Sequence, residues 1–258
     1  MSDDPKFENP VEGLFNEAAD SVAARPHFYR ELLGSQVLIC PHGNIEESDD
    51  PEKYTSTLKM ETVTVESIQY VPFFLAEKFL PPRRRYIPLS AKRFFEITKG
   101  SHLVLNPGHV PMKTFAPDEV AKLLSGELLK PEKEFQVKNN ASLVIGPAPE
   151  NPLQILDQVA KFFDREPGVL RAWLAWYKNP TVESQSGYLL AIEIVSSVDF
   201  PNLAGRLSFV LKEVGTGGPF CDIVRYTGSD FTRYFTSQKP FFSRPLWRRL
   251  KCTMFGSD

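Results

Sequence analysis

The stretch Tyr188-Leu-Leu-Ala-Ile-Glu-Ile-Val195 decides the fold of the second half of the chain, because all but one of its residues are apolar. A short, nearly uninterrupted apolar run is typical of a strand in the centre of a sheet. Residues 170–177 precede it and alternate in character, which predicts a second strand. Its predicted inner face consists of Leu170, Ala172, Leu174 and Trp176. We expect the two strands to pair as a hairpin.

Helices are predicted on both sides of this strand pair, because apolar residues recur there at helical spacing. The first apolar stripe contains Leu153, Leu156, Val159, Ala160 and Phe163. The second contains Leu203, Leu207, Val210, Leu211 and Val214. A third strand is predicted at 221–226, and a helix from about residue 230. The order α-β-β-α-β-α favours an antiparallel-rich sheet with helices on one face.

The first half of the chain is divided by clear helix signals. Asn9 and Pro10 suit the start of a helix, and Gly126 suits the end of one that Pro117 opens. We predict helices at 10–22, 26–34, 90–99 and 117–126, and strands at 36–40, 61–66, 68–74, 86–89 and 104–105. A stretch rich in Pro, Gly and Asn falls near 138–150 and indicates a domain break.

The predicted fold class is therefore α+β. We expect two α/β-sandwich-like domains, at 1–138 and 147–258, each with a mixed or mostly antiparallel sheet and helices packed on it.

Composition narrows the partner classes. The formal net charge of −2 gives no strong overall field, so we expect neither nucleic acid nor a membrane as partner. No apolar run approaches the length of a membrane span, and the first residues carry no secretion signal. The three cysteines are far apart, which favours a reducing cytoplasm.

No familiar catalytic or metal-binding pattern occurs in the sequence. The four histidines, His27, His42, His102 and His109, are not at ligand spacing from one another or from a cysteine. Cys40 and Cys221 lie in apolar strand contexts that are typical of structural thiols. We therefore predict no cofactor, no metal and no enzymatic activity. An undetected enzyme that uses Cys252 or His102 is the alternative.

Three surfaces are candidates for binding a protein partner. The first is the C-terminal tail, where aromatic and basic residues alternate; this composition suits either docking on the chain's own core or a protein interface. The second is an arginine cluster, and the third is an acidic loop. The candidate residues are Phe241, Phe242, Arg244, Trp247, Arg248 and Arg249 in the tail, Arg83, Arg84 and Arg85 in the cluster, and Glu46, Glu47, Asp49 and Asp50 in the loop.

Several short motifs, in a fixed order, resemble the bacterial SseB family, named for enhanced serine sensitivity. They are Ala24-Arg-Pro-His-Phe-Tyr-Arg-Glu-Leu-Leu, Val71-Pro-Phe-Phe, Phe94-Phe-Glu-Ile-Thr-Lys-Gly, Leu103-Val-Leu-Asn-Pro, Lys113-Thr-Phe-Ala-Pro, Cys221-Asp-Ile and Lys239-Pro-Phe-Phe followed by Trp247. The resemblance covers nearly the whole chain. It implies a cytoplasmic bacterial protein with an N-terminal and a C-terminal SseB domain.

The resemblance implies little about mechanism. Overproduction of the founding type sensitises cells to serine, no catalytic residues are established for the family, and related domains occur beside secreted toxins. The leading hypothesis is a non-enzymatic protein-binding protein, more specifically an immunity-type inhibitor that sequesters a cognate toxin. A cytoplasmic regulator that affects serine or sulfur metabolism is the alternative.

Overall fold

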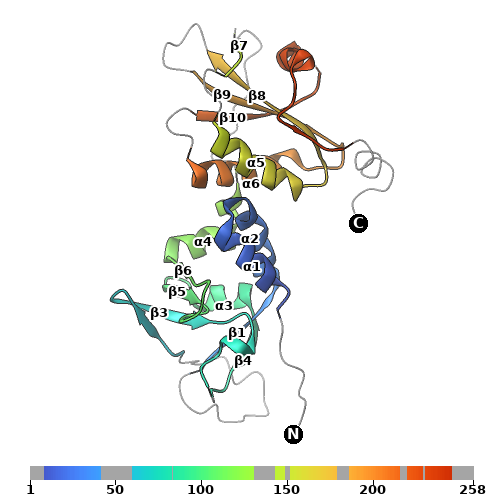
Figure 1. Cartoon of the computed structure of the whole chain (residues 1–258). Coiled ribbons are helices and arrows are strands. Elements are labelled where there is room, and N and C mark those ends of the chain that lie inside the picture. Colours follow the sequence, from blue (N-terminus) through green and yellow to red (C-terminus); the bar gives the residue numbers. More distant parts are fainter. Residues whose placement is uncertain are drawn as a thin grey trace. The chain divides into compact units, whose positions relative to one another are not determined.

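The computed structural model describes residues 9–41, 60–82, 84–130, 143–148, 152–178, 186–215, 220–228 and 230–245. The chain forms two structural units, Met1–Leu128 and Leu129–Asp258 (Figure 1). Each unit has its own sheet with helices beside it, so the α+β class is confirmed. The predicted domain limits, 1–138 and 147–258, stay a prediction.

The helices of the N-terminal unit begin within one residue of the predicted positions, but α1 and α3 each end two residues before the predicted limits of 22 and 99. The Asn9 side chain accepts a hydrogen bond from the Val11 N–H (2.9 Å), and the Ser90 hydroxyl accepts one from the Arg93 N–H (3.3 Å). Gly126 ends its helix at a φ of +70°, which glycine adopts readily. The helices are α1 (Val11–Asp20), α2 (Arg25–Gly34), α3 (Ala91–Ile97) and α4 (Pro117–Ser125), with 3-10 turns η1 (Val22–Ala24), η3 (Glu77–Phe79) and η4 (Glu127–Leu129).

The main sheet of this unit is mixed and has the order β2-β3-β5-β6. The two outer pairs are antiparallel, and β3 runs parallel to β5. A separate antiparallel pair joins β1 to β4. The strands are β1 (Gln36–Ile39), β2 (Val63–Val65), β3 (Ile68–Phe73), β4 (Ile87–Ser90), β5 (Leu103–Leu105) and β6 (Lys113–Phe115).

Phenylalanine rings fill the space between this sheet and α3. Phe73 of β3 lies 5.1 Å from Phe94 and 5.6 Å from Phe95, measured between ring centroids. Phe115 of β6 lies 5.8 Å from both Phe73 and Phe95, and all four side chains are fully buried. Tilted and edge-to-face contacts of this kind add to the stabilisation from apolar burial. This cluster joins α3 to the middle of the sheet.

The C-terminal unit is built around a long hairpin. Strands β8 and β9 pair antiparallel along most of their length, which confirms the predicted pairing. Strand β10 is parallel to β9, and the sheet order is β10-β9-β8-β11, with β7 also paired to β8. The elements are β7 (Val144–Gly146), α5 (Leu153–Asp164), β8 (Val169–Lys178), β9 (Ser186–Ile194), α6 (Phe200–Val214), β10 (Phe220–Arg225), η5 (Asp230–Ser237) and β11 (Phe242–Ser243).

Both faces of this sheet are covered, whereas the sequence predicted helices on one face. Helices α5 and α6 lie on one side, and η5 lies on the other (Figure 1). Phe235 of η5 packs against a buried cluster that includes Trp173 and Leu189. Of the predicted inner face of β8, Ala172 is buried, whereas Leu170, Leu174 and Trp176 are half-buried. The opposite face is the more buried one, with Trp173, Ala175 and Tyr177.

The predicted apolar stripe of α5 is wrong at its first position. Leu153 is 69% exposed, whereas Ile155 and Phe162 are buried together with Val159 and Phe163. The buried face thus follows i, i+4, i+7 and i+8 from Ile155. The region 138–150 was predicted to be irregular, but Val144–Gly146 forms β7 because the outer edge of β8 offers it hydrogen bonds.

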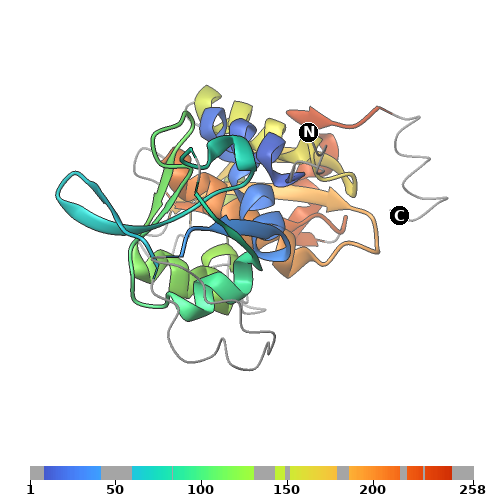
Figure 2. The same ribbon diagram turned by 90° about the horizontal axis from the view of Figure 1, so that it is seen from below.

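Strands β2 and β3 form a hairpin that projects from the body of the N-terminal unit (Figure 2). Its turn residues, Glu66 and Ser67, have φ values of 48° and 68°. Two positive φ values in a two-residue loop are the geometry of a type I′ turn, which favours Asn and Gly over Glu and Ser. The turn therefore does not have the residues that would stabilise it most.

Replacing the turn residues by Glu66→Asn with Ser67→Gly should stabilise the protein, because Asn and Gly adopt positive φ at less cost. We expect the free energy of unfolding to rise by about 1 kcal/mol. Urea unfolding followed by circular dichroism measures it. Ser67→Ala is the control and should give no gain, since alanine is disfavoured at positive φ. An unchanged midpoint for the Asn-Gly variant would contradict this reading of the turn.

Candidate functional site

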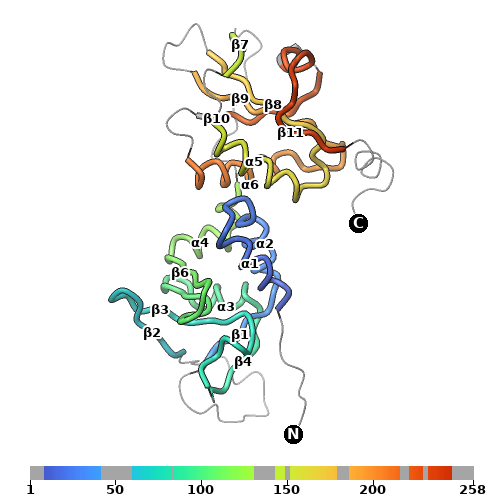
Figure 3. The backbone as a smooth tube through the Cα atoms, viewed as in Figure 1, coloured from blue at the N-terminus to red at the C-terminus, as the bar shows by residue number. Residues whose placement is uncertain are grey.

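The start of the C-terminal tail is part of the unit's own sheet. Strand β11 pairs antiparallel with β8, opposite Ala172 and Arg171, and extends the sheet edge (Figure 3). The Phe241 N–H donates to the Ala172 carbonyl (3.0 Å). The Phe242 ring is 8% exposed and lies 5.3 Å from that of Phe163 on α5. Phe241 is half-buried, with its ring 6.5 Å from the same phenylalanine.

Arg244 anchors the tail through backbone carbonyls. Its Nε donates to the Val169 carbonyl (2.9 Å), and its Nη2 donates to the carbonyls of Phe163 (2.6 Å) and Glu166 (2.9 Å). The arginine is 5% exposed. Phe163 lies in the last turn of α5, where carbonyls lack helical partners and a cation is favoured by the helix dipole. Arg244 therefore ties the end of α5 and the start of β8 to the tail.

For Phe242 and Arg244 the structure shows internal docking. Their burial within their own unit leaves little of either side chain for another molecule. The partner-binding role predicted for the tail stays a prediction, and Trp247, Arg248 and Arg249 lie outside the described residues.

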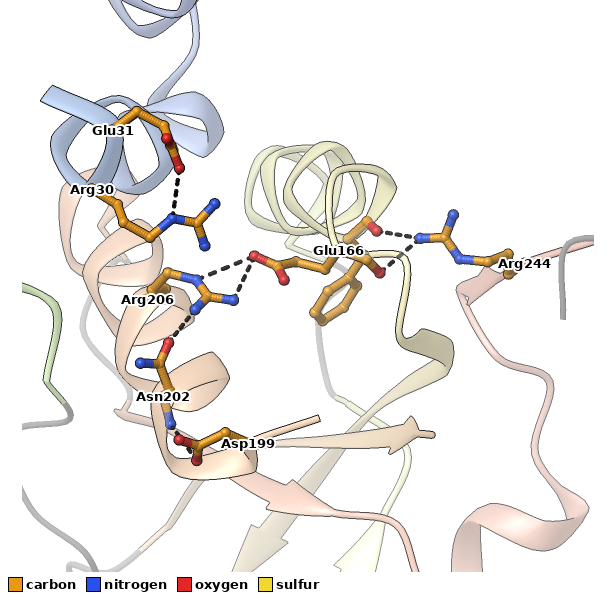
Figure 4. A network of polar contacts seen from close by, with 8 residues as sticks. Arg30, Glu31, Glu166, Asp199, Asn202, Arg206 and Arg244 are labelled. Atoms are coloured by element: carbon orange, nitrogen blue, oxygen red, sulfur yellow. Dashed lines mark hydrogen bonds and ion pairs between the residues drawn. The ribbon is translucent and has the colours of Figure 1, made fainter. Parts of the chain in front are cut away.

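A buried ion pair, which sequence patterns did not reveal, lies beside this anchor. Arg206 of α6 donates from Nε (3.2 Å) and Nη2 (2.7 Å) to Oε1 of Glu166, and from Nη1 to Oδ1 of Asn202. The two charged side chains are 10% and 13% exposed. Glu166 thus accepts from Arg206 through its carboxylate and from Arg244 through its backbone carbonyl (Figure 4). We assign the network to holding α5, α6 and the tail together.

The arginine cluster is on the surface of the N-terminal unit. Arg84 makes an ion pair with Glu61 (2.7 Å), and its side chain is 56% exposed. Arg85 is exposed, and Arg83 lies outside the described residues. The exposed Lys92 and Arg93 follow β4 directly, in the first turn of α3. We call residues 84–93 the basic segment.

Two exposed apolar side chains accompany the basic segment. Tyr86 is 37% exposed, and its hydroxyl donates to Oε1 of Glu77 (2.5 Å). Ile97, one turn beyond Arg93 on α3, is 47% exposed. The acidic loop predicted as the third surface (Glu46, Glu47, Asp49 and Asp50) lies outside the described residues.

Two of the three described histidines contact aromatic rings. The ring of His102 lies edge-on to Tyr70 at 5.5 Å, and that of His109 lies edge-on to Phe79 at 5.1 Å. Nε2 of His109 is 3.1 Å from the Phe79 carbonyl oxygen. His27 is buried. Within the described residues, no group of three histidine, cysteine or acidic side chains is arranged to hold a metal ion.

The described thiols are held in their protonated form. Burial, followed by the neighbouring Asp222 carboxylate, raises the pKa of Cys221 to about 12. Burial and then Glu61 raise the pKa of Cys40, against the lowering effect of Arg84. Burial and a hydrogen bond to Asp222 likewise raise the pKa of Tyr177. Raised pKa values of this origin are typical of structural groups and disfavour the thiolate that a nucleophile needs.

The comparisons with known proteins agree with this two-unit architecture. The model of the SseB protein N-terminal domain matches residues 11–122, and that of the SseB protein C-terminal domain matches residues 137–244. The chain belongs to the SseB family. Among curated relatives, Protein SseB of Escherichia coli (strain K12) and that of Shigella flexneri are each 24% identical to this chain over 196 residues, which is 74% of this chain and 75% of each relative. No solved structure gives a significant match.

Family membership confirms the resemblance that the short motifs of the sequence indicated. The relatives carry no enzyme name. Within the described residues, no helix is long and apolar enough to span a bilayer.

We expect Arg244→Ala to destabilise the C-terminal unit by about 3 kcal/mol, because three carbonyls around a buried site would lose a charged donor. Arg244→Lys should recover part of this loss, since an ammonium cannot reproduce the planar fork. All three tryptophans lie in the C-terminal half, so tryptophan fluorescence during urea unfolding reports on this unit. Lys239→Ala, at an exposed neighbouring position, is the control. If Arg244→Ala and Lys239→Ala were equally stable, the proposed anchoring role of Arg244 would be contradicted.

The raised thiol pKa values predict slow labelling of Cys40 and Cys221 in the folded protein. At pH 8, a thiol reagent should modify Cys221 about a hundredfold or more slowly than in the unfolded chain, as measured by peptide mass spectrometry.

The unfolded thiol ionises near pH 9.0 and the folded one near pH 12. Stability from this group is therefore complete below pH 9 and falls as the pH rises toward 12. Cys221→Ala should lack that part of the alkaline loss.

Proposed function

We propose that this SseB-family chain is a non-enzymatic protein that binds an acidic protein partner through the basic segment of its N-terminal unit. The observation that carries the proposal is that exposed cations and exposed apolar side chains lie close together in the sequence, between Arg84 and Ile97. Tyr86 and Ile97 supply the apolar area, and Arg85, Lys92 and Arg93 supply the charge. Tyrosine and arginine are enriched at protein interfaces, where they contribute much of the binding energy.

Two cations of the basic segment are ion-paired, Arg84 with Glu61 (2.7 Å) and Arg93 with Glu96 (3.5 Å). Elsewhere, Lys78 pairs with Glu12 (2.6 Å) and Lys113 with Glu119 (2.9 Å). Within the part of the chain that the structure describes, neither Arg85 nor Lys92 makes a side-chain ion pair. These charges stay available to a partner.

Arg84 has a different role in the proposal. Its ion pair with Glu61 joins the basic segment to the residues just before β2, and so supports the position of the segment. Complementary charge raises the association rate and selects among partners more than it adds affinity. The partner is therefore expected to present an acidic face, and binding is expected to weaken as salt is added.

The more specific form of the proposal is that of an immunity-type inhibitor in the cytoplasm that sequesters a cognate toxin through an acidic face of that toxin. The resemblance to domains found beside secreted toxins motivates it. Its test is expression of the recovered partner alone and together with this chain. A partner that harms cells alone and is neutralised by co-expression supports inhibition. A partner that is harmless alone contradicts inhibition but leaves binding intact.

Charge reversal tests the binding proposal. The triple variant Arg85→Glu, Lys92→Glu, Arg93→Glu should recover about tenfold less partner than the natural protein in affinity purification from native cells, because like charges now face the acidic partner. New acids at the start of α3 suit the helix dipole, which offsets the loss of the exposed Arg93–Glu96 ion pair (3.5 Å), so folding should be preserved. Mass spectrometry measures the partner that is retained.

The matched control reverses three exposed cations outside the basic segment: Lys122→Glu, Lys130→Glu and Lys161→Glu. Both triple variants change the net charge equally, so a purely global effect would reduce recovery in both. Retention of the partner by the control and its loss from the first variant support the proposal. Equal recovery from both variants, or no partner at all, would contradict it.

A further inference from the structure

The outer edge of β2 is the second feature of the N-terminal unit with the properties of an interface. Among the described strands, β2 has one neighbour, β3. Val65 and Ile68 flank the two-residue turn and face each other. In a two-residue hairpin such a flanking pair exchanges both of its backbone hydrogen bonds. The next residue, Thr64, therefore directs its N–H and carbonyl away from β3.

The hairpin has one apolar and one polar face. The cross-strand pairs Val63–Tyr70 and Val65–Ile68 share one face, and Thr64–Gln69 lies on the other. Ile68 is 41% exposed, and both valines are half-buried. Among the described elements, β3 is the one with which β2 has substantial contact. An amphipathic hairpin that projects from its unit (Figure 2) thus leaves part of its apolar face exposed.

Several other sheet edges carry residues that hinder pairing, whereas β2 and the short β7 do not. Strand β4 has Pro88, which lacks an N–H, and β6 begins with Lys113. Strand β10 carries the charged Asp222 and Arg225. Prolines and charges at edges are the usual protection against strand addition. Val63, Thr64 and Val65 contain none of these, and no second described strand pairs with β2.

We propose that a second copy of this chain occupies the β2 edge, so that two β2 strands pair antiparallel about a two-fold axis at Thr64. The inference is independent of the basic segment and its partner. The outward N–H of Thr64 then donates to the carbonyl of the second copy's Thr64, and the Thr64 carbonyl accepts from the N–H of that same residue. Val63 lies opposite Val65 of the second copy, and the four-stranded sheet doubles in width.

Self-pairing in this register opposes no two like charges, because Val63, Thr64 and Val65 are uncharged. The chain turns at Glu66 and Ser67, so the pairing is confined to the three residues of β2. The register also brings the apolar faces of the two hairpins together on one side. An isologous contact of this kind needs a self-complementary patch, which a strand centred on Thr64 provides.

The contact is small, and this determines the strength of the expected dimer. Stable interfaces bury about 1,200–2,000 Å² in total, and a pair of three-residue strands with its flanking side chains covers less. We therefore expect weak, concentration-dependent self-association.

Analytical ultracentrifugation of the full chain tests the proposal over about a hundredfold range of concentration. The mass of the natural protein should rise from 29.2 kDa toward twice that value. Thr64→Lys should weaken the dimer about tenfold or more, because the two-fold axis places two lysines opposite each other. Thr64→Glu should do the same. Neither change touches a hydrogen bond between β2 and β3, so both variants should keep the melting temperature of the natural protein.

Mixing the two variants makes the test specific for a second copy. In an equimolar mixture, the introduced lysine of one chain would face the introduced glutamate of the other, so dimers should return. Gln69→Lys is the matched control; it adds the same charge to the same face, on the inner strand, and should leave self-association unchanged.

Dimers that form for the natural protein, disappear in each Thr64 variant and return in the mixture support the proposal. A natural protein that stays monomeric throughout, a dimer insensitive to Thr64→Lys, or a mixture that stays monomeric would each overturn it.

Discussion

The hydrogen-bonding demand of strand β8 organises the C-terminal unit. A buried strand needs partners for its backbone on both edges. One edge of β8 is paired along its length with β9, whereas the other is shared by two short strands, β7 and β11. Strand β11 comes from the tail, so the last described residues are drawn onto the sheet. The burial of Phe242 and the anchoring of Arg244 follow from that pairing.

The corner between α5 and β8 concentrates the unit's internal polar contacts. The carbonyls of Phe163 and Glu166 in this corner each accept one backbone N–H, and Arg244 supplies a further, charged donor to each. The carboxylate of Glu166, in the same corner, also accepts hydrogen bonds from the Arg206 side chain of α6. Buried charges are tolerated when each is paired and hydrogen-bonded, and their value lies more in specifying one arrangement than in net stability. The tail and both helices thus share one fixed corner.

The two surfaces proposed for binding both belong to the N-terminal unit, and they differ in chemistry. The basic segment offers charge beside exposed aromatic and aliphatic area, which suits a partner of opposite charge. The β2 edge offers backbone groups and an apolar face, which suit another strand. Glu61 connects them, because it precedes β2 and pairs with Arg84. A second copy at β2 and an acidic protein at the basic segment would use separate groups on the same unit.

Local sequence signals were enough to predict the helices with clear caps, the β8–β9 hairpin, the α+β class and the family. Pro117 and Gly126 limit their helix through local backbone sterics. The apolar run at 188–195 favours a buried strand whichever segments pack against it. Among the candidate residues, the sequence located the exposed cations Arg84 and Arg85 but left Phe242 and Arg244 with two alternatives. The folded arrangement was needed to show that these two are internal, that Val144–Gly146 is a strand, and that Leu153 is exposed. Each depends on what a distant segment offers: the free edge of β8, the carbonyls at the end of α5, or the face against which a helix packs. Such contacts have no periodic signature in the sequence.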